Sequence, residues 1–506
     1  MIEVLMRRRT TTLSALVSGL LLLAALTGCT AGDADESQTL HVIRAESFDG
    51  WDPDKAAAYA TYQTLSNVEE PLLTFGSDGH SITPGIATAW NYDAEARTWT
   101  FTLRDGVAFS DGKPLTPQDV IFSATVWAKG KNYGSLYKNI AAVTSDDPHS
   151  VVFHMSTPDT TLPVLMTWSS SAIFPKDFGG VNESTFWQKP VGAGAFAIES
   201  WSTGGQTVLV ANPHYYGKVG VRRVVITTVT DANQGAALLE SGQADISEYV
   251  TPQDAAAYGS AIKALPSSQI EHLSFNTTRA PLDDVHLRRA IAHAIDTPMI
   301  IKGAFKGYGE AAAGIIPSGL ANGAAPDVPE PSFDLAAAKA ELAQAAATPA
   351  GLEVVYDASN QTDKNVAQIL KQNLAALGID LTLAPLETGT FLDRAYGLKS
   401  DLVLWSYGPV SPDVSDPLAW ISGTSWLFSG ADTDRIVAQF GAYTAAQDPA
   451  ARQDVVRQVQ DDAASQVLAA PIAQFQVLDA VGPRVRGFAP APWGMYAWSA
   501  ITLGKG

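Results

Sequence analysis

The amino-acid sequence predicts an α/β protein with mixed sheets, and three observations support this fold class. Strand-like and helix-like patterns alternate along most of the 506 residues. Hydrophobic residues make up 46% of the chain, enough for large cores, while the glycine, proline and charge contents are not extreme. Apart from a Pro- and Gly-rich segment at 319–332, no long linker divides the body. We therefore expect two or three closely joined domains.

The chain begins with the pattern of a secretory signal. A cluster of arginines at 7–9 precedes a mostly apolar run from Leu13 to Leu26, which is shorter than the about 20 residues that a spanning helix needs. Residues 26–29 read Leu-Thr-Gly-Cys and resemble a bacterial lipobox. We predict a signal peptide at 1–28 and a mature chain that starts at a lipidated Cys29. An ordinary cleaved signal with a chance cysteine is the alternative, and Met6 is a second possible start.

The next residues, 30–40, are short, polar and acidic, which predicts a flexible tether. Further along, Thr98 to Leu103 places Trp99, Phe101 and Leu103 on one face at a period of two, which predicts a strand. A helix is expected directly after Thr116. Thr116 suits the N-cap and Pro117 the first helical position, and the acidic Asp119 favours the positive helix start.

The same alternation continues to the C-terminal half. β-branched residues predict strands from Thr207 and from Val221. Residues 284–296 form an amphipathic helix with Leu287, Ile291, Ala294 and Ile295 on its apolar face, and Arg288, Arg289 and His293 mostly off it. A helix is expected from Asp334, and another ends at Gly378 before an alternating strand.

Composition and motifs exclude several kinds of function. The formal charge of −19 argues against nucleic acid as a partner, because a phosphate-binding protein needs a basic footprint. The one cysteine is Cys29, so no disulfide is expected in the body. The chain contains no nucleophile elbow, zinc-binding HExxH or phosphate loop, and its eight histidines are scattered, so we predict neither a metal nor a cofactor. The stretch at 192–197 matches the glycine pattern of a dinucleotide-binding turn. A strand-like run follows it, however, where such a site requires a helix.

A family resemblance covers the chain from about residue 45 to the C-terminus. Residues 103–123, LRDGVAFSDGKPLTPQDVIFS, are similar to the signature of solute-binding proteins of peptide-type ABC importers, family 5. The stretches PVGAGAFAIESW from Pro190 and LSFNTTRAPLDDVHLRRAIAHAID from Leu273 look like further parts of that family's pattern.

The resemblance implies a two-lobed periplasmic-binding-protein-like fold of type II with hinge strands. Its first lobe would have a core of 41–62, 190–270 and 480–506 and an inserted subdomain at 63–189, and its second lobe would span 271–479. Ligand would be enclosed between the lobes by closure. The implied partners are a peptide or other small solute and the permease and ATPase complex of an importer. The chain would be a monomer, anchored by lipid on the extracytoplasmic face of the membrane.

The resemblance also points to candidate ligand-binding residues. In peptide binders of this family an aspartate takes the ligand's α-amino group, and Gly408 stands at that position here. Trp405 matches the family's tryptophan, Trp426 follows nearby, and Arg394 is the nearest cation for a ligand carboxylate, although a solvated role is favoured for it. The full set of candidates comprises Phe48, Asp49, Trp51, Trp405, Ser406, Tyr407, Gly408, Asp413, Asp416 and Trp420.

A peptide is the favoured ligand, with an oligosaccharide, another organic solute or a metal chelate as alternatives. An alternative interpretation makes Asp413 and Asp416 turn residues. The corresponding alternative for each tryptophan is a position in the core. A secreted hydrolase is the alternative from another functional class, but the sequence contains no motif for a catalytic nucleophile or a metal site. A signalling receptor subunit would use the same closure.

Overall fold

The computed structural model describes residues 36–46, 48, 50–56, 59–76, 78, 81–409, 411, 413–423, 431–491 and 494–504. The predicted signal peptide at 1–28, the lipidation site Cys29, tether residues 30–35, and the candidates Asp49 and Trp426 lie outside the described residues. Strand β1 (Thr39–Arg44) begins two residues before the expected start of the folded body at 41. None of the described helices combines the length and the apolar character that crossing a membrane requires.

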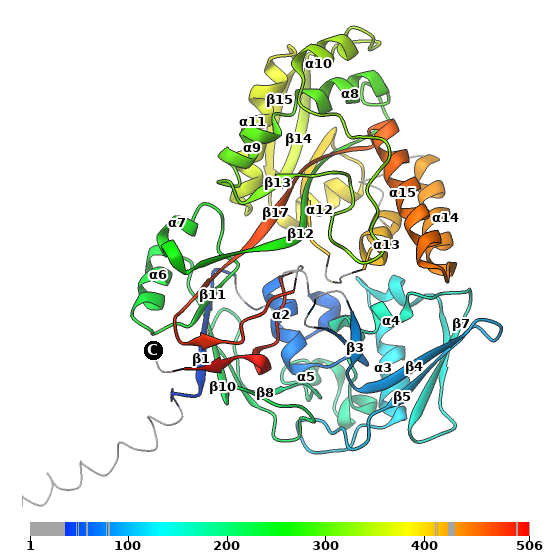
Figure 1. The fold of residues 1–506 in the computed structure, drawn as a ribbon, viewed down its shortest axis with the longest axis vertical. Coiled ribbons are helices and arrows are strands. Elements are labelled where there is room, and N and C mark those ends of the chain that lie inside the picture. Colours follow the sequence, from blue (N-terminus) through cyan, green and yellow to red (C-terminus); the bar gives the residue numbers. More distant parts are fainter. Residues whose placement is uncertain are drawn as a thin grey trace, which may run out of the picture.

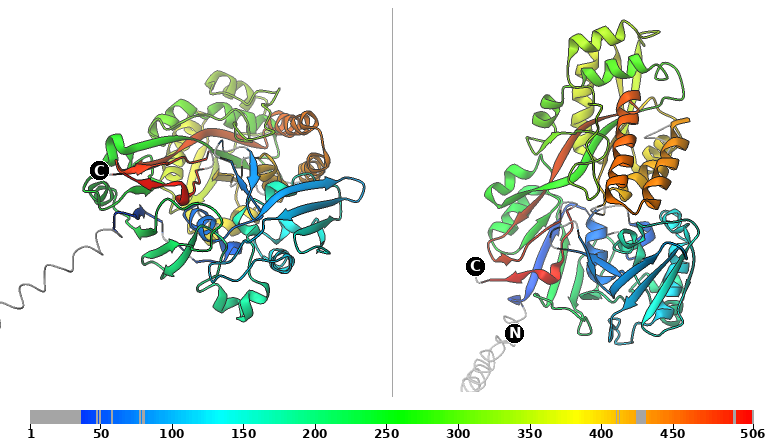
Figure 2. Two further views of the ribbon diagram at one scale, coloured as in Figure 1. Left: turned by 60° about the horizontal axis from the view of Figure 1, so that its bottom comes forward. Right: turned by 45° about the vertical axis from the view of Figure 1, so that its right-hand side comes forward.

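Two lobes, joined by two long antiparallel strands, make up the described chain (Figures 1 and 2). The joining strands, β12 (Ile262–Phe275) and β17 (Ala469–Val481), belong to a mixed sheet of 11 strands that runs through both lobes. Its order is β15 (Asp380–Leu386), β14 (Gly351–Asp357), β16 (Leu402–Tyr407), β12, β17, β11 (Ile246–Glu248), β1, β10 (Arg223–Thr228), β9 (Thr207–Ala211) and β8 (Phe196–Ser200), and β13 (Gly309–Ala311) pairs with β17 off this path. The α/β class with mixed sheets is confirmed.

The pairing of β12 with β17 breaks where these strands pass between the lobes. Residues 262–265 of β12 pair with 477–480 of β17 in the first lobe. After a register shift between Leu265 and Gln269, residues 269–274 pair with 469–475 in the second lobe. Such an irregularity bends a sheet and leaves residues outside the ladder, so it marks a place where the lobes can turn relative to each other.

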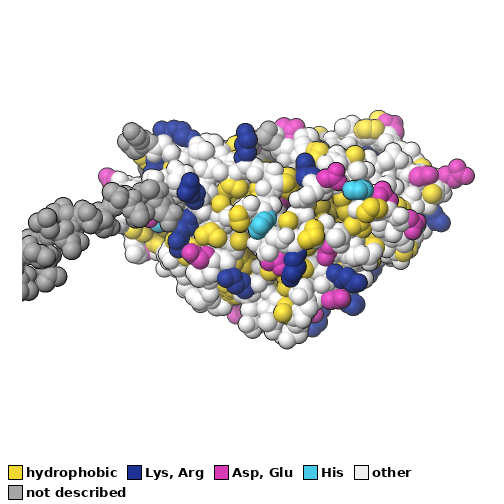
Figure 3. All heavy atoms as spheres, turned by 90° about the horizontal axis from the view of Figure 1, so that it is seen from below, with side chains coloured by type: hydrophobic (Ala, Val, Ile, Leu, Met, Phe, Trp, Pro, Cys, Tyr) yellow, Lys and Arg dark blue, Asp and Glu magenta, His cyan; other side chains and the backbone are white. Residues whose placement is uncertain are grey.

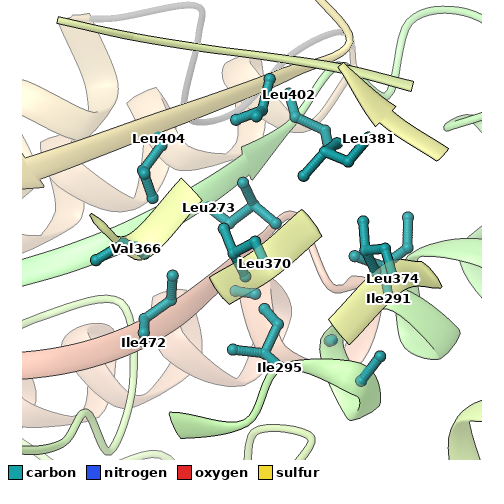
Figure 4. Packing of buried hydrophobic residues seen from close by; sticks show 14 of the residues in the cluster. Leu273, Ile291, Ile295, Val366, Leu370, Leu374, Leu381, Leu402, Leu404 and Ile472 are labelled. Atoms are coloured by element: carbon teal, nitrogen blue, oxygen red, sulfur yellow. The ribbon is translucent and has the colours of Figure 1, made fainter. Parts of the chain in front are cut away.

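The second lobe packs helices against one face of its part of the sheet. Helix α8 (Val285–Ala294) buries Leu287 and Ile291, as its predicted apolar face requires. Helix α11 (Gln361–Ala375) adds Val366, Leu370 and Leu374 to the same core, which also holds Leu273 and Leu402 of the sheet (Figure 4).

Arg288 departs from the expectation for this helix, because its side chain is only 4% exposed. Its guanidinium donates to the carbonyl oxygens of Leu282 at 2.7 Å and of Val467 at 3.0 Å. Val467 follows helix α15 (Pro449–Gln466) in a left-handed conformation with φ 46°, so the arginine satisfies carbonyls at a helix end.

The first lobe combines the other half of the large sheet with an inserted sheet in the order β4 (Ala87–Asp93), β5 (Thr98–Leu103), β7 (Ser150–Met155) and β6 (Ile140–Thr144). Strand β5 has its predicted bounds. Helix α3 (Pro117–Trp127) begins after Thr116, as predicted, and Asp119 completes a capping box at this end.

The glycines of 192–197 lead into β8, and a Cβ at Gly192 would lie 2.0 Å from the carbonyl oxygen of Val68. They therefore allow close packing against the end of helix α2 (Tyr59–Val68). The remaining helices and strands are α4 (Leu162–Leu165), α5 (Glu183–Phe186), α6 (Ala232–Glu240), α7 (Ala255–Tyr258), α9 (Thr297–Gly303), α10 (Leu335–Leu342), α12 (Thr388–Tyr396), α13 (Ser415–Gly423), α14 (Ala431–Ala445), β2 (Leu73–Phe75), β3 (Ile82–Pro84), β18 (Val485–Arg486) and β19 (Thr502–Leu503).

The underside of the first lobe carries charges of both signs. Figure 3 shows Lys and Arg side chains interspersed with Asp, Glu and His on this face. A surface that follows a nucleic-acid backbone clusters positive charge instead.

Candidate ligand-binding cleft

The second lobe presents an aromatic wall built by the end of β16 and by helix α13. The rings of Tyr407 and Trp420 are stacked, with centroids 4.2 Å apart and planes at 18°. The ring of Trp405 lies 6.2 Å from that of Trp420 and 4.9 Å from that of Phe391 on α12. Trp405, Tyr407 and Trp420 are only half-buried, so part of each ring remains available for contact.

Asp416 supplies the acidic group of this wall. Tyr407 donates its hydroxyl to Oδ1 of Asp416 at 2.6 Å, and the amide of Ser411 donates to Oδ2 at 3.0 Å. Loss of solvation raises the pKa of Tyr407 well above its usual value, and the negative charge of Asp416 raises it further. Asp416 is therefore fixed in the wall by its partners and is only 5% exposed.

Asp413 lies beside the wall with both of its carboxylate oxygens engaged. Oδ1 accepts from the hydroxyl of Tyr443 at 2.9 Å and from the amide of Ser415 at 2.8 Å, and Oδ2 accepts from Asn322 Nδ2 at 2.7 Å. These contacts tie α13 to α14 and to the loop around residue 322. Asp413 thus makes one local bond, to Ser415, and two bonds that join separate parts of the second lobe.

Gly408 is the point where the first lobe meets the aromatic wall. A Cβ at this position would lie 1.8 Å from Oη of Tyr59 on α2, a residue of the first lobe. The same hydroxyl donates to the carbonyl oxygen of Pro409 at 3.3 Å. The tyrosine therefore occupies the space into which any side chain at position 408 would extend.

Two further tyrosines of the first lobe lie on the same side. Tyr62 of α2 and Tyr133 are hydrogen-bonded to each other through their hydroxyls, and the two hydroxyl oxygens lie 3.0 and 2.6 Å from the carbonyl oxygen of Ala56. Loss of solvation is the main cause that raises the pKa of each tyrosine, and the charge of Asp416 in the second lobe contributes to both. The charge of Asp416 therefore acts on both tyrosines across the boundary between the lobes.

Sequence reasoning did not select Tyr59, Tyr62 or Tyr133. A signal existed for the first two, because their spacing of three on α2 puts them on one helix face. No local pattern marks Tyr133, which comes from the inserted subdomain.

The other candidates lie elsewhere. Phe48 and Trp51 are 6% and 1% exposed and pack edge-to-face with centroids 4.6 Å apart in the core of the first lobe. Ser406 lies between Trp405 and Tyr407 on β16, so its side chain points to the opposite face of the strand. Arg394 forms an ion pair with Glu353 of β14. The structure thus brings together Trp405, Tyr407, Gly408, Asp416 and Trp420, and places Phe48 and Trp51 in a packing cluster.

A second contact between the lobes lies beside the aromatic wall. The backbone amide of Thr160 in the inserted subdomain donates to the carbonyl oxygen of Thr444 at 2.8 Å. Its hydroxyl lies 2.9 Å from the carbonyl oxygens of Thr444 and Ala446 and accepts from Arg452. Because these carbonyls are at the C-terminal end of α14, the contact satisfies helix-end groups of one lobe with donors from the other.

Within the described ranges, no group of three or more His, Cys, Asp or Glu side chains is arranged to hold a metal ion. The boundary between the lobes is thus characterised by tyrosine and tryptophan rings, one fixed carboxylate, and hydrogen bonds that join the two lobes.

Comparisons with known proteins agree with this architecture. Residues 81–428 match the family model described as bacterial extracellular solute-binding proteins, family 5 middle. A probable D,D-dipeptide-binding periplasmic protein of Escherichia coli is 28% identical over 403 residues, covering 77% of this chain and 76% of the relative. A dipeptide-binding protein of Pseudoalteromonas in complex with Met-Leu superposes with a TM-score of 0.80 at 20% identity, over 92% of this chain and 100% of the other. NikA of Brucella suis in complex with Fe(III)-EDTA gives 0.83 at 19% identity, over 92% and 100%.

Proposed function

Because this chain belongs to family 5 of the bacterial extracellular solute-binding proteins, we propose that it captures a peptide between its lobes and delivers it to the permease of an ABC importer. The observation that carries the proposal is the aromatic wall of Trp405, Tyr407 and Trp420, which faces tyrosines of the other lobe. Aromatic rings bury apolar side chains and stack on planar groups, and tyrosine hydroxyls bond to peptide amides.

Closure is the mechanism of capture. The pairing of the two long strands that join the lobes is interrupted at the boundary, so the lobes can turn relative to each other between an open and a closed form. A ligand that touches the wall of one lobe and the tyrosines of the other binds the closed form better and shifts the population toward it. The permease then meets a closed, loaded protein.

The ligand's amino group is not held by a carboxylate at position 408, where this chain has glycine and Tyr59 fills the space. We propose that Asp416 acts on the ligand through its charge, since it is only 5% exposed and is held by hydrogen bonds from Tyr407 and Ser411. A free N-terminus is therefore not required. Thermal-shift screening of dipeptides and tripeptides, followed by calorimetry of each hit and its N-acetylated form, tests this. We expect both forms to bind with affinities within about tenfold.

Tight binding of the free peptide with loss of its acetylated form would overturn the amine-independent site but keep peptide capture. The second candidate ligand is an oligosaccharide. The observation that favours it is that the wall formed by Trp405, Tyr407 and Trp420 is aromatic and contains no Lys or Arg, which suits a neutral ligand. A stabilising shift with chito-oligosaccharides, and none with peptides, would select it.

We also propose that the mature protein is attached to the membrane through lipid at Cys29 and acts as a monomer. Lipid chains hold a protein at a bilayer by burying methylene groups. Replacing the cysteine by alanine (Cys29→Ala) should move the protein from the membrane pellet to the soluble fraction without changing its melting temperature. If the variant stays in the pellet, the anchor lies elsewhere.

A further inference from the structure

A cavity of about 510 Å³ lies between the inserted subdomain of the first lobe and helices α13 and α14 of the second. The segment 135–168 supplies one side of it. Ser415, Ala419 and Ser422 of α13 and Phe440 of α14 supply the other. Its volume is within the range of about 300–1,000 Å³ that small-molecule sites occupy.

Helix α13 borders both this cavity and the aromatic wall. Ser415, Ala419 and Ser422 recur at intervals of four and three, which places them on one face of the helix. Asp416 and Trp420 each follow one residue later and lie on the adjacent face, where they contact Tyr407. The cavity therefore adjoins the wall, separated from it by the width of one helix face.

The cavity is completed only when the lobes meet. Thr444 lines it from the second lobe, and Asp159 and Thr161 line it from the first. Thr160, between these two residues, makes the hydrogen bonds to the end of α14. A molecule inside would touch both lobes and would stabilise the closed form, as a ligand at the wall does.

The lining combines hydrogen-bonding groups with apolar surface. Hydroxyl and amide side chains come from Ser135, Asn139, Ser156, Thr157, Ser415 and Ser422, and apolar surface from leucines and from Phe440. Trp168 adds an aromatic side chain to the lining.

Few residues of the lining are charged. Lys138 and Asp159 are its charged residues among those described. The carboxylate of Asp159 already accepts from Thr161 at 2.7 and 2.8 Å and from Asn139 at 3.1 Å. The cavity therefore suits a neutral segment that carries amides and apolar side chains, which describes the interior of a peptide chain.

We propose that this cavity is a second compartment of the ligand site, which takes the residues of a peptide that extend beyond the aromatic wall. The proposal rests on peptide capture as the function. It assigns the protein a preference for tripeptides and longer peptides over dipeptides, because a dipeptide at the wall leaves the compartment unfilled.

The test uses the wild type, three variants and one defined probe, a pancreatic digest of casein. Ala419→Trp fills the compartment from α13. Ser422→Phe fills it with a smaller side chain and replaces the first variant if that one does not fold. Ala442→Trp is the matched control, because Ala442 is an exposed residue of α14 outside the lining. Retained peptides are eluted, identified by mass spectrometry, and counted by length.

The wild type and the Ala442→Trp control should retain mainly tripeptides and longer peptides. The filled variants should lose these by about tenfold or more while keeping dipeptides. Equal length distributions in all proteins, or a wild type that retains only dipeptides, would overturn the compartment and leave peptide capture standing. Retention of no peptide by the wild type would overturn both proposals.

Discussion

Because Gly408 lies against Tyr59, we predict that a single added methyl group at position 408 hinders closure of the lobes. In Gly408→Ala the new Cβ would lie 1.8 Å from Oη and 2.8 Å from Cζ of Tyr59, and 2.9 Å from Cγ of Gln269. Ordinary contacts of this kind are above 3.4 Å, so either the tyrosine moves or the lobes separate. Overpacking of this kind costs about 1–3 kcal/mol. Because the clash with Tyr59 exists only when the lobes meet, that part of the cost falls on the closed form.

A penalty of this size on the closed form weakens ligand binding about 5–150-fold. Calorimetry measures this loss with any ligand found by the peptide screen, and small-angle X-ray scattering measures the larger radius of gyration of a more open protein. Gly441→Ala is the control, since a Cβ there meets nothing within 4 Å. Removing the obstacle in the double variant Gly408→Ala, Tyr59→Ala should restore closure. Wild-type affinity and compactness in Gly408→Ala alone would refute the reasoning.

Three further outcomes are expected. Trp405→Ala should weaken ligand binding by about 1–3 kcal/mol, and unchanged affinity in calorimetry would assign Trp405 to the core. Thr160→Val removes the hydroxyl that bonds to the carbonyl oxygens at the end of α14, which should destabilise the closed form by about 0.5–1.5 kcal/mol; scattering curves identical to those of the wild type would contradict this. Burial, followed by the charge of Glu248, raises the pKa of Asp479 to about 8. The stability contributed by its neutral form is present below the unfolded pKa of about 4 and is lost as pH rises toward 8. Asp479→Asn should therefore flatten the fall in melting temperature over this range, and an equal fall in both proteins would exclude Asp479 as a cause.

Local patterns predicted much of the fold. The strand at 98–103 and the helix start after Thr116 depend on residues adjacent in sequence, and the structure has them where expected. Arg288 differed because its partners are the carbonyls of residues 466 and 467, which reach it only through the tertiary fold. A charged side chain on a helix gives no local sign of such a partner.

The candidate site was predictable on one side only. Its second-lobe wall comes from a short stretch, 405–420, so family resemblance and aromatic content could select it together. The facing tyrosines could not be selected this way, because the contact from Tyr59 to Pro409 joins residues 350 positions apart. Phe48 and Trp51 have the same residue types as the wall but a different environment, since β1 and its neighbours enclose them in a core.

Native mass spectrometry of the mature chain tests the central claim most directly. The protein would be made without Cys29 in the organism that encodes it and purified gently, so that an enclosed ligand is retained. The account predicts an added mass that fragments into amino acids. A retained glycan or metal chelate would contradict peptide capture.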